Sequence, residues 1–413
     1  MSSPSFADLG VSPVIARALQ ARGVREPFAI QRLVVPDVLD GHDVLAKSPT
    51  GSGKTLAFGA PMMDCIEADD PRPAGLVLAP TRELAGQIVE ELRELAHARA
   101  LSVTAVYGGA GIDRQARQAP RSHIVVATPG RLEDLMGRGA VRLDEVRVLV
   151  LDEADRMLDM GFRPAVDRIV RATPDDRQTM LFSATLDGEV GRIAEEYTHD
   201  ARRHEHTPTV EARGRVDHRF VRVAHEEKLD ALVRELDGHA RGRTLVFVRT
   251  KRGADRLVKR LARHRLEAVA MHGDKSQNQR ERALARFDRG EIDTLVATDV
   301  AARGIDVEGI THVINFDAPA ERDQYVHRVG RTARAGASGV GVTLVMGDQA
   351  AEMGKIAAEL DLRREFAKTG FPSTPIHRGG PARADRAGGE GPGSTRDRRS
   401  RNRRSRSRSG AAR

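Results

Sequence analysis

The feature that most constrains the fold of this chain is the alternation of short apolar segments with helical patterns along most of its length. Two series of such segments occur, at residues 43–46, 75–79, 103–107, 123–127, 146–151 and 179–182, and at residues 219–223, 244–248, 268–271, 294–297, 312–316 and 340–345. Amphipathic patterns such as those of residues 83–96 and 254–264 separate them. Apolar strands that alternate with helices are typical of parallel sheets covered on both faces. The two series therefore predict an α/β fold with two tandem parallel-sheet domains.

Composition suggests where these domains end. The polar stretch at residues 198–214 has weak periodicity and contains Pro208, so we place the domain boundary within it. We assign residues 1–207 to the first domain, 208–215 to a linker, 216–368 to the second domain and 369–413 to a tail. The tail is rich in Gly, Pro, Ser and Arg and has almost no large apolar residues. It cannot bury a core, and we expect it to be disordered.

The positive charge of the chain is concentrated in this tail. The net charge is +8, but residues 376–413 contain 12 Arg against three acidic residues, which leaves the preceding part close to neutral. A charge argument for nucleic-acid binding therefore applies only to the tail. Residues 396–408 read RDRRSRNRRSRSR and contain no aromatic side chain that could stack on bases. Two interpretations stay open: a salt-sensitive tether for phosphates, or a solubilising end.

Several classes of protein are excluded by what the sequence lacks. It has no run of 18 or more apolar residues, which predicts no transmembrane span, and its N-terminal residues have no basic start followed by an apolar stretch, which predicts no secretory signal. Cys65 is the only cysteine, so neither an intramolecular disulfide nor a cysteine-based zinc site can form. We expect a cytoplasmic protein without membrane contact, and a monomer by default.

A glycine-rich loop between the first apolar segment and a helical pattern predicts a phosphate site. The loop reads SPTGSGKT over residues 48–55. Its glycines let backbone N–H groups converge on phosphate oxygens at the start of a helix. Lys54 is expected to reach the β- and γ-phosphates and Thr55 to bind Mg²⁺. Further nucleotide contacts are predicted from Thr50, Gly51, Ser52 and Gly53. Ser48 stands where the general pattern has glycine, and the competing interpretation is an ordinary glycine-rich turn.

Two carboxylates at the end of a later apolar segment predict the second half of this site. Residues 149–155 read LVLDEAD. Asp152 is expected to hold Mg²⁺, and Glu153 to accept a proton from the attacking water. Asp152 alone could equally cap the next helix. A helix cap does not explain why a phosphate loop and an acidic strand end occur in one chain.

Residues 152–155 read DEAD, and the chain resembles the DEAD-box helicases that this segment names. Further motifs follow in the order of that family: PTRELA (80–85), GG (108–109), TPGR (128–131), SAT (183–185), QNQR (277–280), ATDVAARGID (297–306) and HRVGRTAR (327–334). The similarity extends from about Phe6 to Val345. It implies two RecA-like domains and an ATP-dependent RNA helicase that uses ATP and Mg²⁺.

The resemblance also assigns roles to individual residues. It implies that RNA is contacted, mainly through its backbone, by Arg82, Gly109, Thr128, Arg131, Thr298 and Arg303. Ser183 and Thr185 are expected to couple hydrolysis to strand separation, and Asp306 to reach the ribose. His327, Arg331 and Arg334 come from the second domain, and arginines opposite a γ-phosphate stabilise the charge that develops in transfer. Hydrolysis would then require the two domains to close, so that ATP and RNA tighten each other's binding.

A segment near the N-terminus resembles the adenine-reading motif of the same family. Residues 23–31 read GVREPFAIQ, and Phe6 lies seventeen residues before this segment. The Gln31 amide has one acceptor and two donors, which can pair with the N6 and N7 edge of adenine. Phe6 is the expected aromatic partner. The chain departs from the family at Phe28, where Thr is usual, and at Val24, where an aromatic residue is usual.

These motifs predict local separation of short RNA duplexes with little sequence preference. One competing interpretation is a DNA helicase of a related superfamily, which a comparison of ATPase stimulation by RNA and by matching DNA would distinguish. Another is an RNA clamp, annealing factor or RNP-remodelling ATPase with little strand separation. A Glu153→Gln protein that kept normal turnover would overturn the assignment of the base.

Overall fold

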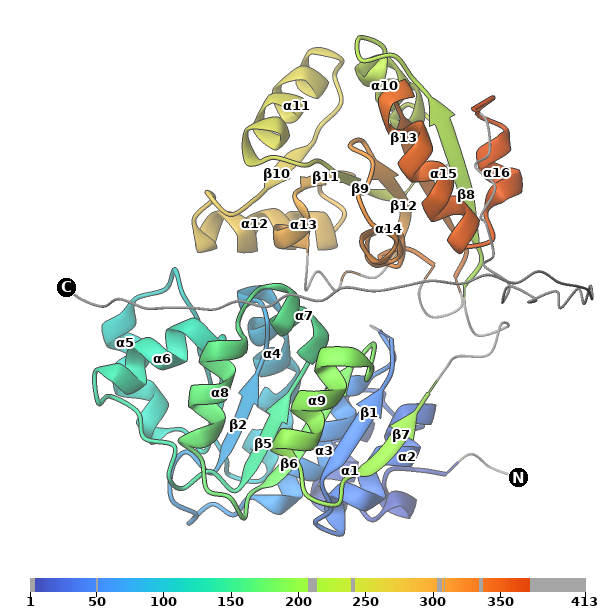
Figure 1. The fold of residues 1–413 in the computed structure, drawn as a ribbon. Coiled ribbons are helices and arrows are strands. Elements are labelled where there is room, and N and C mark those ends of the chain that lie inside the picture. The colour runs from blue at the N-terminus through green and yellow to red at the C-terminus, as the bar shows by residue number, and fades with distance from the viewer. Residues whose placement is uncertain are drawn as a thin grey trace, which may run out of the picture. The chain divides into compact units, whose positions relative to one another are not determined.

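The structure, a computed structural model, describes residues 4–49, 51–206, 214–238, 242–302, 307, 309–333 and 337–371. Its strands form two sheets, one with the order β3-β4-β2-β5-β6-β1-β7 and one with the order β10-β11-β9-β12-β13-β8 (Figure 1). Within the described residues, every pair of neighbouring strands is parallel. The expected α/β fold with two parallel-sheet domains is confirmed. The tail prediction concerns residues that lie almost entirely outside the described part.

The first sheet and its helices occupy the first half of the chain. Its strands are β1 (Val44–Lys47), β2 (Gly75–Leu78), β3 (Val103–Val106), β4 (Ile124–Ala127), β5 (Val148–Leu151), β6 (Gln178–Ser183) and β7 (Arg202–Glu205). Its helices are α1 (Pro13–Ala21), α2 (Ala29–Leu39), α3 (Lys54–Cys65), α4 (Arg82–Ala98), α5 (Ile112–Gln118), α6 (Pro129–Gly137), α7 (Ala154–Asp159), α8 (Arg163–Arg171) and α9 (Gly188–Tyr197).

The second sheet follows in the remainder of the chain. Its strands are β8 (Val216–Arg222), β9 (Arg243–Phe247), β10 (Val269–Met271), β11 (Thr294–Ala297), β12 (Ile310–Asn315) and β13 (Gly339–Val345). Its helices are α10 (Lys228–Leu236), α11 (Lys251–Arg263), α12 (Gln277–Asp288), α13 (Asp299–Ala302), α14 (Arg322–Val329), α15 (Ala350–Glu359) and α16 (Arg363–Ala367). Among the described residues, no helix is long and apolar enough to cross a membrane.

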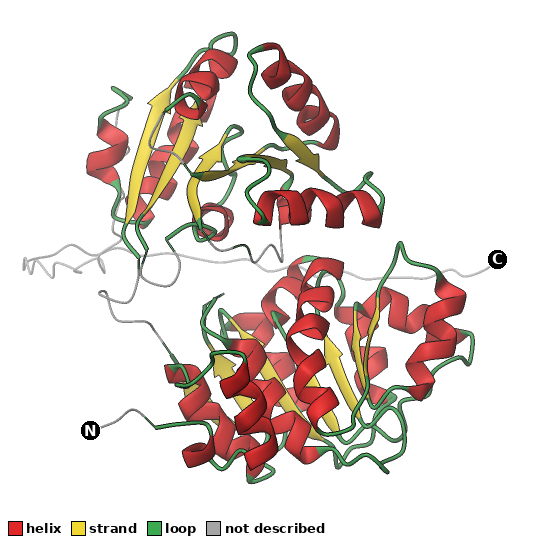
Figure 2. Ribbon diagram, turned by 180° about the vertical axis from the view of Figure 1, so that it is seen from behind, coloured by secondary structure: helices red, strands yellow, loops and turns green. Residues whose placement is uncertain are grey.

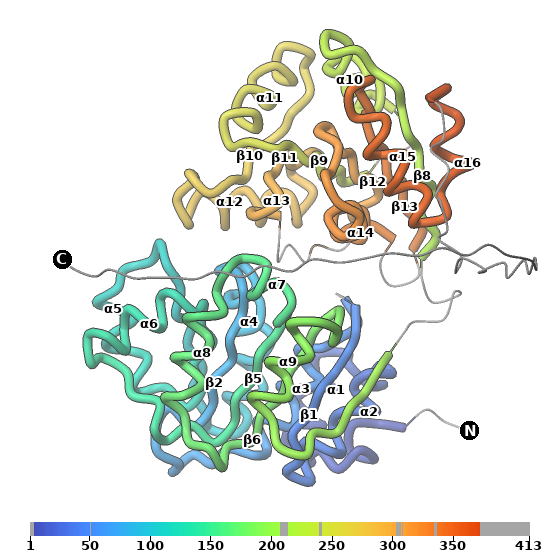
Figure 3. The backbone as a smooth tube through the Cα atoms, viewed as in Figure 1, coloured from blue at the N-terminus to red at the C-terminus, as the bar shows by residue number. Residues whose placement is uncertain are grey.

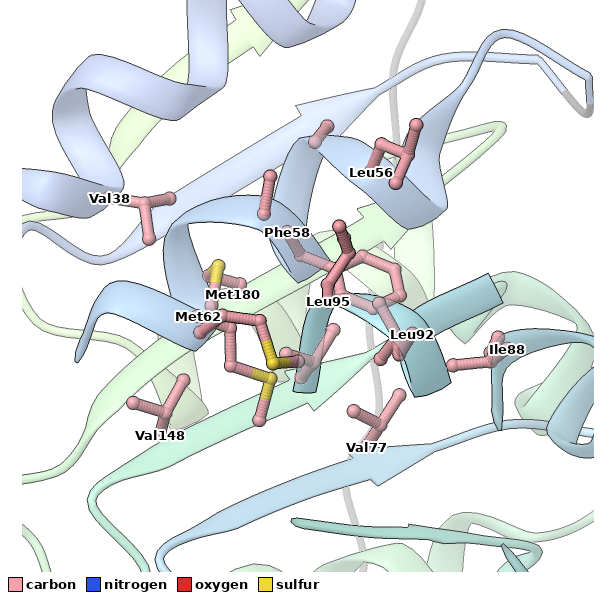
Figure 4. Packing of buried hydrophobic residues seen from close by; sticks show 14 of the residues in the cluster. Val38, Leu56, Phe58, Met62, Val77, Ile88, Leu92, Leu95, Val148 and Met180 are labelled. Atoms are coloured by element: carbon pink, nitrogen blue, oxygen red, sulfur yellow. The ribbon is translucent and has the colours of Figure 1, made fainter. Parts of the chain in front are cut away.

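Helices cover both faces of the first sheet, because alternate side chains of each strand point to opposite faces (Figure 2). In β2, Val77 joins the core formed with α1 to α4, whereas Leu76 and Leu78 join the core formed with α6 to α9. Figure 4 shows the first of these cores, where Phe58 and Met62 of α3 lie among side chains of α4 and the sheet. The tube in Figure 3 shows α8 and α9 running along the other face.

The second sheet is covered in the same way. One face packs against α10 and α11, and the opposite face packs against α12 and α13. A third apolar cluster joins β8 to α14, α15 and α16, with Tyr325 and Phe366 buried at its centre. Both sheets are therefore interior layers, as their nearly continuous apolar strands predicted.

The twelve predicted strands are all present, and one further strand was missed. β7 lies inside the polar stretch in which we placed the domain boundary, and it pairs with β1 at the edge of the first sheet. Its sequence is RRHE, without an apolar residue, because three of its four side chains are exposed. Backbone hydrogen bonds stabilise this edge strand, and hydrophobic periodicity does not report them. The exact domain limits stay a prediction.

The order of the strands determines which loops can meet. In an open parallel sheet, ligand sites lie beyond the carboxyl ends of the strands. β5, β6 and β1 are neighbours, so the loops that follow them lie together, and β3, β4 and β2 form a second neighbouring group. The phosphate loop follows β1 and the DEAD segment follows β5. The fold thus brings the two halves of the predicted nucleotide site to one edge.

Candidate functional site

The phosphate loop begins at the carboxyl end of β1 and is anchored to β6. Ser48 donates its backbone N–H to the carbonyl of Ser183 at 2.9 Å. Gly51 and Gly53 have φ values of 79° and 83°, in the left-handed region that glycine adopts without strain. Lys54 is buried at the start of α3, and its Nζ lies 3.4 Å from the Ser48 carbonyl oxygen. The loop therefore curls around its own lysine, as a phosphate-binding loop requires.

The remaining loop residues have different surroundings. The Ser52 hydroxyl donates to the Pro49 carbonyl at 2.8 Å, and Thr55 is half-buried in the first turn of α3. Ser183 is fully buried at the end of β6, and Thr185 donates its N–H to the Ser183 hydroxyl at 3.3 Å. The predicted coupling segment thus continues directly from the strand that anchors the phosphate loop.

The DEAD carboxylates lie at the end of β5 and are almost completely buried. Asp152 is 2% exposed and Glu153 is 3% exposed. The Asp152 Oδ1 accepts the Glu153 N–H at 2.9 Å. Glu153 has a φ of 52°, a conformation that costs a non-glycine residue free energy and is concentrated at functional sites. The sequence pattern did not reveal this left-handed turn at Glu153, which connects β5 to α7.

Arg156 pairs with Glu153 inside the protein and was not singled out in the sequence. Its Nη1 donates to Glu153 Oε2 at 2.8 Å, and both side chains are 4% exposed. The two residues are three positions apart at the start of α7, a spacing at which helical side chains meet. That spacing was the available signal.

Burial and neighbouring charges shift the pKa values of Asp152 and Glu153 in opposite directions. Burial raises the pKa of Asp152 to about 6, and the charge of Glu153 adds to this increase while Lys54 opposes it. Burial also raises the pKa of Glu153, but Arg156, Lys54, Arg331 and His327 together outweigh it and lower that pKa. Glu153 therefore stays ionised and able to accept a proton near neutral pH.

Two residues of the second domain act on this buried carboxylate. The guanidinium charge of Arg331 contributes to the lowered pKa of Glu153, and the imidazole of His327 adds to it when it is protonated. His327 is itself affected by the DEAD segment: burial lowers its pKa first, the charge of Arg156 lowers it further, and Asp155 opposes. A cavity of ≈ 410 Å³ is lined by both His327 and Arg331 together with Asp159 of α7. The structure thus brings these predicted second-domain residues towards the DEAD segment.

Arg328 holds the second-domain part of this site together. Its Nε and Nη2 donate to the two oxygens of Asp299 at 2.6 and 2.8 Å, and its Nη1 donates to the carbonyl of Asp317 at 2.6 Å. Gln324 also donates to Asp299, at 2.8 Å. The start of α13, directly after Thr298, is therefore bound to α14, which carries His327. Sequence reasoning assigned no role to Arg328.

Gln31 binds backbone groups on both sides of its amide. Its Oε1 accepts the Phe28 N–H at 2.7 Å, and its Nε2 donates to the Gly53 carbonyl at 2.9 Å. Gln31 is 1% exposed and connects the start of α2 to the phosphate loop. Phe6 is 2% exposed and belongs to the apolar core that also contains Ile30. The adenine-reading roles of Gln31 and Phe6 stay predictions.

Four of the residues predicted to bind RNA lie beyond neighbouring strands of the first sheet. A Cβ placed at Gly109 would collide with the guanidinium of Arg82, so these two residues are in close contact. The Arg131 Nη1 donates to the Ala110 carbonyl at 3.0 Å. Thr128 is buried at the start of α6. Arg82, Gly109 and Arg131 therefore gather around one loop, the one that follows β3.

A buried ion pair joins this region to the second domain. Arg280 Nη2 lies 2.9 Å from Glu83 Oε1, and the two side chains are 9% and 4% exposed. Burial raises the pKa of Glu83 although Arg280 opposes it, and burial lowers the pKa of Arg280. Both residues lie within the motifs quoted above, but neither was predicted to pair. Thr298, the remaining described RNA candidate, is buried directly after β11.

Four predicted site residues lie outside the described residues, namely Thr50, Arg303, Asp306 and Arg334. Within the described part, no group of three His, Cys, Asp or Glu side chains is placed to hold a metal ion. The hydroxyl of Thr55 and the carboxylate of Asp152 are oxygen donors of the kind that Mg²⁺ prefers, and Mg²⁺ commonly completes its coordination with phosphate oxygens and water. The residues present therefore fit a magnesium ion that arrives with a nucleotide.

A parallel sheet with a phosphate loop after one strand and buried carboxylates after a near neighbour is the arrangement of a nucleoside-triphosphate-binding protein. Comparison with known proteins agrees. A family model described as "DEAD/DEAH box helicase" matches residues 28–193, and one described as "Helicase conserved C-terminal domain" matches residues 227–336.

Individual relatives extend the similarity over both domains. "ATP-dependent RNA helicase CshA" of Limosilactobacillus reuteri is 44% identical over 345 residues, which cover 82% of this chain and 69% of that protein. "DEAD-box ATP-dependent RNA helicase CshA" of Geobacillus kaustophilus is 41% identical, with 83% and 73% covered. The structure of S. cerevisiae Dbp5 bound to RNA and ADP BeF3 aligns with a TM-score of 0.78 at 28% identity, covering 88% of this chain and 99% of that one. The chain belongs to the DEAD/DEAH box helicase family.

Proposed function

We propose that this chain is an ATP-dependent RNA helicase that binds RNA across both domains and locally separates short duplexes. The observation that carries the proposal is the buried Glu153 at the end of β5, on which Lys54 of the first domain and Arg331 of the second both act. Relatives at 40–44% identity are named as ATP-dependent RNA helicases. A structural neighbour was solved with both RNA and ADP BeF3.

In the nucleotide site, each residue has a part that follows from its position. Lys54 and the loop N–H groups hold the phosphates, and Glu153, which Arg156 keeps ionised, accepts a proton from the attacking water. Arg331 stabilises the charge that develops on the transferred phosphoryl group. Mg²⁺, held by Thr55 and Asp152, supplies charge neutralisation at the phosphates when it is bound.

We propose that RNA binds at the loops that follow the neighbouring strands β3, β4 and β2. Arg82 and Arg131 lie around the loop that contains Gly109, where backbone N–H groups and guanidinium groups suit phosphates. The Glu83–Arg280 pair connects this region to α12 of the second domain. We propose that RNA bound here favours the arrangement in which Arg331 acts on the nucleotide. We further propose a cytoplasmic monomer, as the single Cys65 fits a reducing compartment.

The proposal is tested with the purified full chain and its Lys54→Gln variant. ATP hydrolysis is measured without nucleic acid, with single-stranded RNA and with DNA of the same sequence, and separation of a short labelled RNA duplex is followed with ATP. We expect RNA, but not DNA, to stimulate ATP hydrolysis, and we expect ATP-dependent separation of the RNA duplex. Both activities should be lost in the variant. RNA-stimulated hydrolysis without separation would favour an RNA clamp or annealing factor, and equal stimulation by DNA would contradict the RNA assignment.

A further inference from the structure

Phe28 is an aromatic residue in an unexpected position beside the phosphate loop. Its side chain is 61% exposed, which is the largest value among the large apolar side chains of the described residues. A single exposed apolar residue is common on protein surfaces and needs no explanation by itself. Phe28 differs from such residues because it lies directly against the phosphate loop.

The ring of Phe28 packs directly on the loop. A Cβ added at Gly53 would lie 2.5 Å from Phe28 Cδ2 and 3.3 Å from Phe28 Cε2, so the edge of the ring touches the glycine backbone. The Gln31 Nε2 lies on the same side, 2.6 Å from that hypothetical Cβ. One edge of the ring is thus fixed against the loop that precedes Lys54, while most of its surface is open to solvent.

The other residues expected to recognise the base are placed less favourably for stacking. Phe6 is 2% exposed and offers almost no free ring surface. Gln31 holds the loop through the Gly53 carbonyl and receives the Phe28 N–H. Among Phe6, Gln31 and Phe28, only Phe28 presents an aromatic surface beside the phosphate loop.

We propose that Phe28 contacts the base and ribose of the bound nucleotide and stacks against them, a role that rests on the nucleotide site proposed above. Stacking on an aromatic side chain tolerates any base, since every base has a π-face. Phe28 therefore strengthens nucleotide binding whatever the base, and Gln31 supplies the preference for adenine. Phe28 is in this sense an affinity residue that does not set specificity.

Two alanine variants test the contribution to affinity. Phe28→Ala removes the ring, whereas Leu33→Ala removes another exposed apolar side chain of α2, which is 42% exposed. KM and kcat for ATP and GTP are measured at saturating RNA, with dissociation constants for ADP. We expect Phe28→Ala to raise KM and the ADP dissociation constant about tenfold, with similar factors for both purines and little change in kcat. Leu33→Ala should leave all of them unchanged.

A tryptophan variant tests contact with the base itself. The chain contains no Trp, so Phe28→Trp introduces the only indole. We expect its fluorescence to change clearly more on addition of ADP than on addition of inorganic tripolyphosphate, which occupies the loop without a base. The thermal midpoint of each variant is measured to exclude unfolding as a cause.

The outcomes separate this inference from the proposed function. If the parent chain hydrolyses ATP but Phe28→Ala keeps the parental KM, or Phe28→Trp responds equally to ADP and tripolyphosphate, the role of Phe28 is wrong and the helicase assignment is unaffected. If Phe28→Ala weakens ATP binding but not GTP binding, Phe28 sets specificity and the proposal is wrong in that form. A parent chain without RNA-stimulated hydrolysis contradicts the proposed function instead.

Discussion

Two buried carboxylates in the first domain each face a guanidinium group, but the partners come from different distances along the chain. Glu153 pairs with Arg156, three residues away, whereas Glu83 pairs with Arg280 of the second domain. The pKa values move in opposite directions: the charges around Glu153 outweigh burial and lower its pKa, while burial dominates at Glu83 and raises its pKa.

The two ion pairs therefore differ in what they require: we call Glu153–Arg156 the preformed pair and Glu83–Arg280 the conditional pair. The Glu153–Arg156 pair belongs to the turn from β5 into α7 and needs only the first domain. The Glu83–Arg280 pair exists only where α4 and α12 meet. Glu153, the carboxylate proposed as the base, is kept ionised mainly by a neighbour in its own turn, whereas the contact of Glu83 depends on both domains. Removing either partner of a buried pair leaves a charge uncompensated, which is the costly event.

The largest effect is expected at Glu153. Glu153→Gln should lower kcat of RNA-stimulated ATP hydrolysis by about 10²–10⁴, because the amide cannot accept the proton of the attacking water. The amide oxygen can still accept from Arg156, so ATP and RNA binding should be retained. Steady-state hydrolysis and equilibrium binding measure the two parts, with the exposed Glu90→Gln as a matched control. Parental turnover would show that the preformed pair does not contain the base.

The second prediction concerns Asp152, which has no hydrogen-bonded guanidinium partner among the described residues, and the free energy of unfolding. The pKa of Asp152 is raised to about 6 in the folded chain, so its ionised form is unfavourable there. Asp152→Asn should stabilise the nucleotide-free protein by about 2–3 kcal/mol at pH 8, since one pKa unit corresponds to ~1.4 kcal/mol. The gain should shrink as pH falls below 6 and vanish below about pH 4, where the aspartate is neutral in both states. Thermal or urea unfolding at several pH values measures it; a pH-independent gain would contradict the cause.

The conditional pair should show coupling that a surface pair lacks. Glu83→Gln and Arg280→Gln should each weaken RNA-stimulated hydrolysis, and the double variant should be little worse than either, with a coupling energy of about 1–2 kcal/mol. The exposed Arg93–Glu90 pair of α4, at 59% and 67% exposure, is the control and should show no measurable coupling. Additive effects at Glu83 and Arg280 would mean that this contact does not support the active arrangement.

The smallest effect is expected at Arg156, the partner of the proposed base Glu153, and should appear in the pH dependence of kcat. Arg156 lowers the pKa of Glu153, so Arg156→Gln should raise it. A base must be ionised, so the acid limb of the kcat profile should move to higher pH, and activity should be lost mainly at the lower end of the pH range. Arg156→Lys should restore part of the shift. A profile that keeps its position while activity falls uniformly would indicate a role in packing only.

Sequence periodicity predicted most of the fold for a definite reason. Strands buried on both faces must be apolar along their length, so most of the strands were visible as apolar runs. The partly exposed edge strand β8 (Val216–Arg222) was predicted only from residue 219 onward. β7 was not, because an edge strand needs only backbone hydrogen bonds, and its residues Arg202–Glu205 are polar. The order of strands within each sheet was also beyond the pattern, since pairing such as that of β1 with β6 joins segments far apart in the chain.

The residues of the candidate site also fall into those that the sequence reveals and those that only the structure reveals. Lys54, Asp152 and Glu153 stand out because they follow strands and have chemically distinctive neighbours in sequence. The pairing of Arg280 with Glu83 could not be seen, as it depends on the packing of two domains. The exposed ring of Phe28 was visible only as a departure from the family pattern, and its place against Gly53 required coordinates.

The hydrogen bonds of Arg328 have a consequence for how the two predicted ligand sites are connected. Asp299, at the start of α13, and the carbonyl of Asp317 are both held by this one guanidinium on α14. Thr298, predicted to contact RNA, directly precedes α13, and His327, predicted to act at the nucleotide, lies on α14, so the hydrogen bonds of Arg328 link the two predicted sites. A shift of α14 would therefore carry the start of α13 with it through the Arg328–Asp299 contact.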